Sequence, residues 1–254
     1  MNDPAFSSSE RLADREIAIV GLGLMGASLA GALRGKCRQI VGVVRREETI
    51  EIALKRGWID RGTTQLANGV QSADAVVLAT PVRAILHLLD ELGPLLPAQC
   101  LIMDLGSTKA KIVTKMAGLP THVQPLGGHP MCGKEVAGIA AADPALYHGC
   151  TFVLTPLART SDAALGLADA LVRSCGARPL IMEPDRHDQV VATISHLPYA
   201  VACALVATTA RMASQEPAVW DVAASGYRDT SRLAASDVTM MLDILLTNRD
   251  AVLK

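Results

Sequence analysis

Aromatic residues and blocks of like charge are scarce in this sequence of 254 residues. Phe, Trp and Tyr make up only 3% of the chain although half of it is hydrophobic, so the core must be aliphatic and alanine-rich. Such a composition suits helices packed on a parallel sheet better than an aromatic-rich β-sandwich. Lys and Arg (24) nearly balance Asp and Glu (25), and without a basic block the sequence predicts no nucleic-acid partner and no acidic membrane surface.

Paired cysteines and a signal peptide are also lacking. The six cysteines are scattered, with no CxxC pair and no His/Cys spacing typical of a metal site, so we expect reduced thiols and no metal. The polar N-terminal segment has no apolar core, which predicts a cytoplasmic protein. The longest apolar stretch, about 190–207, is interrupted by Ser195, His196 and Pro198. We interpret it as a buried helix and not as a membrane span.

Strand and helix patterns alternate along the first part of the chain, after a polar lead at residues 1–15. Apolar segments that predict strands are followed by helical patterns, and two further strands near 151–154 and 179–182 extend the same sheet. The predicted strands of the first half lie at 17–20, 40–44, 75–79 and 101–104, with helices at about 24–34, 47–56, 82–92 and 108–117. This alternation is typical of a doubly wound parallel α/β sheet.

The character of the sequence changes after residue 183. Helical patterns then follow at about 185–211, 217–224 and 237–253. We therefore predict two domains, an α/β domain at residues 1–183 and a smaller all-helical domain at residues 184–254. A short helical region rich in Ala, Val and Leu would expose apolar surface on its own, so we expect it to form a homodimer.

A glycine motif marks the cofactor site. The segment GLGLMG (residues 21–26) directly follows the first strand and opens a helix, a context in which GxGxxG strongly predicts dinucleotide binding in a Rossmann-type domain. Gly21 allows the tight turn, Gly23 lets the backbone approach the pyrophosphate, and Gly26 lets the helix pack on the strand. The helix N-terminus at Leu24 and Met25 offers N–H groups to the phosphates.

Two arginines follow the second strand, where NAD-binding proteins usually carry an acidic residue against the ribose hydroxyls. Arg45 and Arg46 are suited to bind a 2′-phosphate, so we predict a preference for NADP. If both arginines are only solvated, NAD is accepted as well. Thr80 and Pro81, at the carboxyl end of the third strand, are expected beside the cofactor.

Four further segments carry polar side chains. The segment DLGSTK (104–109) follows a strand, and GGHPMCG (127–133) places His129 on a loop restricted by glycine and proline. In SHLP (195–198), His196 lies in an apolar helix that Pro198 is expected to kink. The segment SGYRDTSR (225–232) supplies cations to an otherwise apolar region.

Together with GxGxxG, these segments resemble the prephenate/arogenate dehydrogenase family over residues 17 to about 237. The resemblance implies an oxidative decarboxylation in tyrosine biosynthesis, in which a base takes the ring hydroxyl proton, hydride goes to the nicotinamide and CO₂ leaves. By this resemblance His129 is the base and must be neutral, Ser107 holds the hydroxyl and the nicotinamide nearby, and His196 assists substrate positioning.

The resemblance also implies substrate-binding cations. Arg232 matches an arginine that grips a substrate carboxylate. Arg228 is either a second such contact or a structural ion-pair partner. Lys134, just past the His129 loop, departs from the family pattern, in which many members carry a small polar residue there; it either recruits a carboxylate or faces solvent.

The Arg45-Arg46 pair looks more like the NADP-using arogenate dehydrogenases, so we predict NADP-dependent conversion of arogenate to tyrosine. The substrate is expected in the cleft between the domains, with parts of the site completed by the partner subunit. One alternative is a prephenate dehydrogenase that makes 4-hydroxyphenylpyruvate, or a cyclohexadienyl dehydrogenase with dual specificity. A β-hydroxyacid dehydrogenase would need a GxxxKxxxN helix, which has no clear match. The joint presence of His129, Ser107, His196 and Arg232 argues against a non-catalytic NADP-binding sensor.

Overall fold

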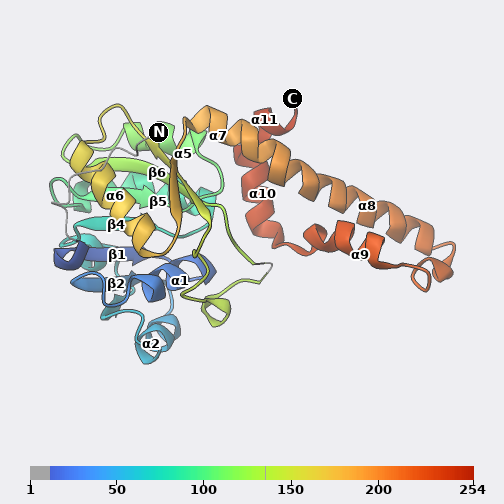
Figure 1. The fold of residues 1–254 in the computed structure, drawn as a ribbon, viewed down its shortest axis with the longest axis horizontal. Helices are drawn as coiled ribbons and strands as arrows, with labels where there is room; N and C mark the ends of the chain where they lie inside the picture. The colour runs from blue at the N-terminus through green and yellow to red at the C-terminus, as the bar shows by residue number, and fades with distance from the viewer. Residues whose placement is uncertain (1–11, 135) are drawn as a thin grey trace.

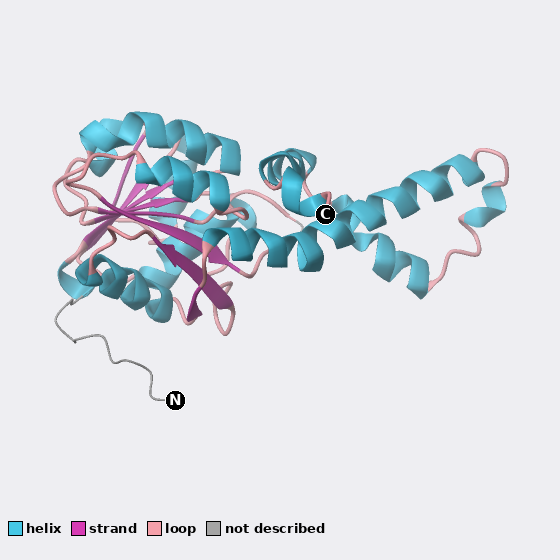
Figure 2. Ribbon diagram, turned by 90° about the horizontal axis from the view of Figure 1, so that it is seen from above, coloured by secondary structure: helices cyan, strands magenta, loops and turns pink. Residues whose placement is uncertain are grey.

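The computed structural model describes residues 12–134 and 136–254, so most of the polar lead predicted at 1–15 lies outside the described residues. An α/β region built on one sheet continues into a helical arm that extends away from it (Figures 1 and 2). The strands are β1 (Glu16–Val20), β2 (Gln39–Val43), β3 (Arg61–Thr63), β4 (Ala75–Leu78), β5 (Leu101–Asp104), β6 (Gln124–Pro130), β7 (Thr151–Pro156) and β8 (Arg178–Ile181).

The sheet has the order β3-β2-β1-β4-β5-β6-β7-β8. Neighbouring strands are parallel except for β6 and β7, which pair antiparallel with His129 opposite Val153. The carboxyl ends of β1, β4, β5 and β6 therefore meet at one edge. The predicted fold class is confirmed: the sheet is mostly parallel and a helical region follows it.

Alternating side chains build an apolar layer on each face of the sheet. On one face Ile17 and Ile19 of β1 pack with Leu29 and Leu33, while on the other Ala18 and Val20 join a second cluster. The first layer is covered by α1 (Leu24–Leu33) and α6 (Asp162–Ser174), and the second by α4 (Val82–Leu92) and α5 (Ala110–Ala117). Burial on both faces explains why the parallel strands are continuously aliphatic.

His129 lies in a strand and not on the predicted loop. Gly and Pro disfavour strands, so the segment QPLGGHP gave no strand signal. Pairing with β5 on one side and β7 on the other nevertheless makes it β6. A Cβ atom on Gly127 would lie 2.0 Å from Thr155 Oγ1, and one on Gly128 would lie 2.5 Å from the Asp104 carbonyl. The two glycines are therefore required by close approach between neighbouring strands.

Two short elements were also missed. Strand β3 has three residues, and α3 (Leu66–Val70) has five, too few for a sequence period to show. The segment between β2 and β4 also contains α2 (Glu47–Lys55), which the sequence predicted.

The helical region differs in detail from the three predicted helices. The first is divided into α7 (Pro184–Val191), a π-helical turn at Ala192–His196 and α8 (Leu197–Ala213). Pro198 has no N–H to donate, and a π turn next to it is one way a helix absorbs that loss. The helix predicted at 217–224 is wrong: Pro217–Val219 is a 3-10 turn, and α9 is Ser225–Ser231. The third helix is divided at Asn248 into α10 (Val238–Thr247) and α11 (Arg249–Val252).

Helix α8 is not the buried helix that the sequence predicted. It forms the long axis of the arm, with α9 beside its far part (Figure 1), and Ala202 is its single buried residue. Leu197 and Val201 are each about half exposed, at 50% and 51%. By length and composition alone, the segment Pro184–Ala213 is long and apolar enough to cross a membrane. One such helix is weak evidence for a membrane span, because core helices of soluble proteins pass the same test. Within one chain its apolar face is left uncovered.

Candidate active site

The glycine turn after β1 is shaped as a dinucleotide site requires. Gly21 has φ of +97°, and a Cβ there would lie 2.7 Å from the Ala79 carbonyl oxygen. A Cβ on Gly26 would lie 1.9 Å from the Gly21 carbonyl oxygen, so helix α1 approaches the turn too closely for any side chain. A Cβ on Gly23 would meet nothing within 4 Å. The open side of Gly23 is where a pyrophosphate would approach the N-terminus of α1, beside Leu24 and Met25.

An unpaired hydroxyl lies next to this turn. The Thr80 Oγ1 atom is buried and has no hydrogen-bond partner within the described part of the chain. Its methyl group would lie 2.8 Å from a Cβ on Gly21, which places Thr80 against the turn. The cofactor contacts of Thr80 and Pro81 stay a prediction. A buried polar atom without a partner is costly unless a ligand satisfies it. Arg45 and Arg46 follow β2 as exposed side chains. These residues fit a dinucleotide.

His129 is hydrogen-bonded to a histidine that the sequence analysis missed. Its Nδ1 atom lies 2.8 Å from Nε2 of His187, the two rings meeting edge to face at 72°. His187 Nδ1 lies 2.8 Å from Oδ1 of Asp188. His187 and Asp188 are buried residues of α7. The signal that could have found them is an adjacent His-Asp pair just before the apolar run that contains His196.

Both predicted histidines are held in the neutral state. Burial lowers the pKa of His129 well below 6.5, and the nearby His187, Lys109 and His196 act in the same direction. Burial lowers the pKa of His196 to about 4, with Asp188 opposing the shift. A neutral imidazole can accept a proton, as the chemistry predicted for His129 demands.

His196 is fixed by an amide. The Asn248 side chain donates from Nδ2 to the Asp188 carbonyl at 2.8 Å and contacts His196 Nδ1 at 3.2 Å. Because a carbonyl can only accept, the amide nitrogen must face both atoms. His196 Nδ1 is therefore the acceptor, and its neutral ring carries the proton on Nε2. His196 and His129 are thus joined to one buried network through Asp188 and His187.

The loop that carries Ser107 is held against β6. Asp104, at the end of β5, accepts hydrogen bonds from the Gly106 and Gly128 N–H groups at 2.7 and 3.1 Å. Lys109 forms an ion pair with Asp104 and donates to the Gly128 carbonyl at 2.6 Å. Burial lowers the pKa of Lys109, and Asp104 opposes this shift. Ser107 is half-buried on this loop, at the same sheet edge as His129.

The three predicted substrate cations are not gathered at His129 within one chain. Arg228 lies on α9 and Arg232 directly after it, both exposed, on the arm that Figure 1 shows beside α8. Lys134 is exposed and forms an ion pair with Asp143 at 3.2 Å. Sequence proximity to His129 therefore does not direct the Lys134 ammonium into the site.

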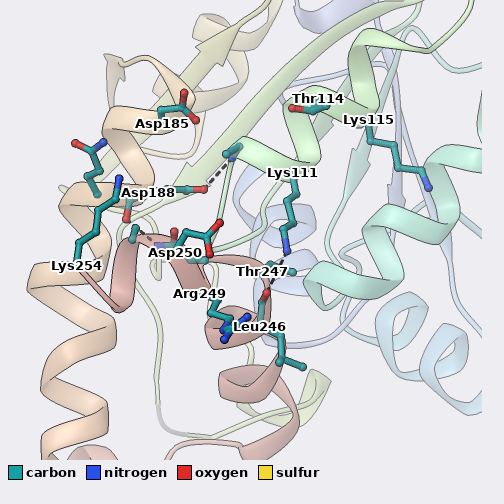
Figure 3. Close-up of a pocket in the computed structure, with 14 residues that line it drawn as sticks. Lys111, Thr114, Lys115, Asp185, Asp188, Leu246, Thr247, Arg249, Asp250 and Lys254 are labelled. Atoms are coloured by element: carbon teal, nitrogen blue, oxygen red, sulfur yellow. Dashed lines mark hydrogen bonds between the residues drawn. The ribbon is translucent and has the colours of Figure 1, made fainter.

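A polar pocket of about 810 Å³ lies elsewhere, between α5, α7 and the last two helices (Figure 3). Asp188 lines it, with Lys111 and Arg249 among the charged groups around it. The pocket does not include the glycine turn, His129 or Ser107. It therefore adjoins the buried network and is separate from the predicted catalytic groups.

Comparison with known proteins agrees with this arrangement. A family model described as the nucleotide-binding domain of prephenate dehydrogenase matches residues 29–181, and one described as its dimerization domain matches residues 183–254. Prephenate dehydrogenase of Bacillus subtilis is 38% identical over 241 residues, covering 93% of this chain and 65% of that relative. The chain thus spans about two thirds of that relative's length.

Two solved structures are similar over nearly the whole chain. Prephenate dehydrogenase from Aquifex aeolicus, in complex with hydroxyphenyl propionate and NAD+, has a TM-score of 0.88 and 34% identity, covering 96% of this chain and 86% of that one. Synechocystis arogenate dehydrogenase has a TM-score of 0.77 and 33% identity, covering 94% and 85%. By its matched domains, its relatives and its fold, this chain belongs to the prephenate/arogenate dehydrogenase family.

Proposed function

We propose that this protein is a nicotinamide-dependent dehydrogenase that oxidatively decarboxylates prephenate to 4-hydroxyphenylpyruvate. The proposal is carried by the position and pKa of His129. Burial lowers its pKa well below 6.5, and it lies at the same edge of the sheet as the glycine turn. The sequence alone predicts arogenate as the substrate. The names of the relatives favour prephenate instead. Arogenate stays a second candidate because of the likeness to the Synechocystis enzyme.

The residues have distinct roles in this proposal. A bound nicotinamide dinucleotide would supply the hydride acceptor for the ring carbon that carries the hydroxyl. The glycine turn and Thr80 would hold the cofactor, with Leu24, Met25 and Pro81 beside it; the glycines of the turn are Gly21, Gly23 and Gly26. His129 accepts the hydroxyl proton as the ring carboxylate leaves as CO₂, and aromatisation of the ring drives the step. Ser107 positions the hydroxyl, and His196 orients the substrate through its Nε2 proton. A positioned base of this kind typically contributes about 10²–10⁴ in rate.

We further propose that Arg45 and Arg46 allow the enzyme to bind NADP. Both side chains are exposed at the end of β2 and can close on a 2′-phosphate. The relative from Aquifex was solved with NAD+, so NAD is expected to be accepted too.

The functional unit that we propose is a homodimer in the cytoplasm. The uncovered apolar face of α8 and the match of residues 183–254 to a dimerization domain support the dimer, and six free thiols suit a reducing compartment. Residues 1–183 would form the nucleotide-binding domain and residues 184–254 the dimerisation and substrate domain. The arm of a second copy would bring Arg232 to the substrate carboxylate, with Arg228 beside it.

Initial rates of reduced-cofactor formation test the proposal, with prephenate and arogenate each combined with NAD and NADP. Turnover of prephenate supports it, and turnover of arogenate alone would reverse the substrate assignment. No turnover in any combination would contradict the proposed function. Mixed dimers of His129→Asn and Arg232→Ala chains test the shared site: activity above that of either variant is expected, and its absence would place Arg232 in its own chain's site or outside it.

A further inference from the structure

The proton arrangement around His129 follows from its buried neighbours, beginning at Asp188. The Asp188 Oδ1 atom accepts a hydrogen bond from the backbone N–H of Lys109 at 2.7 Å, and Asp188 Oδ2 accepts one from the backbone N–H of Ala110 at 2.9 Å. A backbone N–H can only donate, so both oxygens are set as acceptors. Asp188 must therefore also be the acceptor in its 2.8 Å contact with His187 Nδ1. The proton of that contact lies on His187.

The contact between His187 and His129 follows for a neutral His187. A neutral imidazole carries one N–H, so with its proton on Nδ1 the His187 ring has a lone pair on Nε2. That atom faces His129 Nδ1 at 2.8 Å, which makes His129 the donor. Since His129 is neutral, its single proton lies on Nδ1. Its Nε2 atom is then unprotonated, and no described residue forms a hydrogen bond with it.

We propose that His187, oriented by Asp188, is a positioning residue that fixes His129 in the tautomer whose Nε2 atom is free to act as the base. The proposal rests on the proposed dehydrogenase function, in which His129 must accept a proton. It assigns a role to two buried residues, of which His187 contacts His129 and Asp188 contacts His187. When Nε2 takes the hydroxyl proton, the positive charge formed on His129 is stabilised through His187 by the Asp188 carboxylate.

The surrounding structure keeps this chain of three residues rigid. His187 is 1% exposed and Asp188 4% exposed, so water does not compete for their hydrogen bonds. Asn248 holds the Asp188 carbonyl from the C-terminal side, and α5 begins at the N–H groups that Asp188 accepts. Solvent alone would let His129 exchange between its two tautomers, whereas this packing selects one.

The tautomer can be measured without turnover. Nitrogen NMR on the full chain with ¹⁵N-labelled histidine rings distinguishes protonated from unprotonated ring nitrogens, and a His129→Asn sample assigns the His129 signals. In the wild type we expect Nδ1 of His129 to be protonated and Nε2 unprotonated. His187→Leu should populate the form with the proton on Nε2. A proton on Nε2 in the wild type, or an unchanged tautomer in His187→Leu, would overturn the proposal.

Kinetics supply the second readout. His187→Leu should lower kcat by about tenfold or more, while KM changes little. The loss should not exceed the factor of about 10²–10⁴ that the base itself contributes. His187→Gln should recover part of the loss because its amide oxygen can accept from His129 Nδ1. His87→Gln, on the exposed face of α4, is the matched control and should leave the rate unchanged. Equal rates for His187→Gln and His187→Leu would contradict the positioning role.

The His129 tautomer and the turnover of substrate are measured independently of each other. If wild-type protein turns over neither substrate, the function is wrong and the tautomer measurement still decides the proton arrangement. If His187→Leu does not fold, the wild-type tautomer and the His187→Gln variant decide it.

Discussion

The Lys109 ammonium and the Asp104 carboxylate form an ion pair in which neither side chain is exposed to solvent. The pair lies where β5 ends, and Lys109 also donates to the carbonyl of Gly128, the residue before His129. Asp104 accepts from the N–H groups of Gly106 and Gly128 as well. The hydrogen bonds of this one buried ion pair therefore connect the Ser107 loop with the strand that carries His129.

Removing the cation should be costly. Lys109→Met leaves the Asp104 carboxylate buried and uncompensated, so we expect the free energy of unfolding to fall by about 3–5 kcal/mol. Urea unfolding measures the change. The control is Lys115→Met, whose ion pair with Asp90 is exposed to solvent and should contribute no more than about 1 kcal/mol. Equal effects of the two substitutions would show that the buried pair has no special structural role.

Two glycines of one motif should respond differently to alanine. Gly26→Ala forces a Cβ against the Gly21 carbonyl, so we expect lower stability and loss of cofactor binding. Gly23→Ala meets no protein atom within 4 Å and should leave the melting temperature unchanged, yet it places a methyl group where the pyrophosphate approaches. Calorimetric titration with NAD and NADP should then show affinity reduced about tenfold or more, equivalent to about 1.4 kcal/mol. Unchanged affinity in Gly23→Ala would move the cofactor away from this turn.

The arginines after β2 should affect one cofactor more than the other. Arg45→Ala combined with Arg46→Ala removes two cations from the predicted 2′-phosphate site, so KM for NADP should rise about tenfold or more while KM for NAD changes little. The ratio of kcat/KM values for the two cofactors measures this. Arg38→Ala, exposed before β2, serves as the control substitution. A parallel change with both cofactors would indicate a general electrostatic effect and no 2′-phosphate contact.

Activity should persist at acidic pH. Burial lowers the pKa of His129 well below 6.5, so the base stays unprotonated as pH falls through 6.5, and kcat/KM should decline only at lower pH. A plot of kcat/KM against pH from 4.5 to 8 locates this limb. His129→Asn should abolish turnover and preserve cofactor binding. An acid limb centred at or above 6.5 would mean that another group titrates or that His129 is more solvated than the structure indicates.

Much of the fold could be predicted because its signals are local. The aliphatic strands β1, β2, β4 and β5, the helix after the glycine turn and the change to helices near Pro184 each depend on residues adjacent in sequence. Strand β6 could not be predicted, because Gly and Pro oppose a strand that only β5 and β7 impose. The long apolar helix was predicted, but its predicted burial is wrong, since one chain leaves its apolar face uncovered.

The candidate site divides in the same way. The sequence by itself determined the glycine turn, the Arg45-Arg46 pair and the candidates His129, Ser107 and His196, because each lies in a short motif with its own chemistry. Only the tertiary structure decided that His129 contacts His187, 58 positions away in the chain, and that Arg232 directly follows α9 in the helical arm. Residue types follow from sequence, whereas the protonation of a buried histidine depends on which distant groups the packing of α7 against β6 brings into contact.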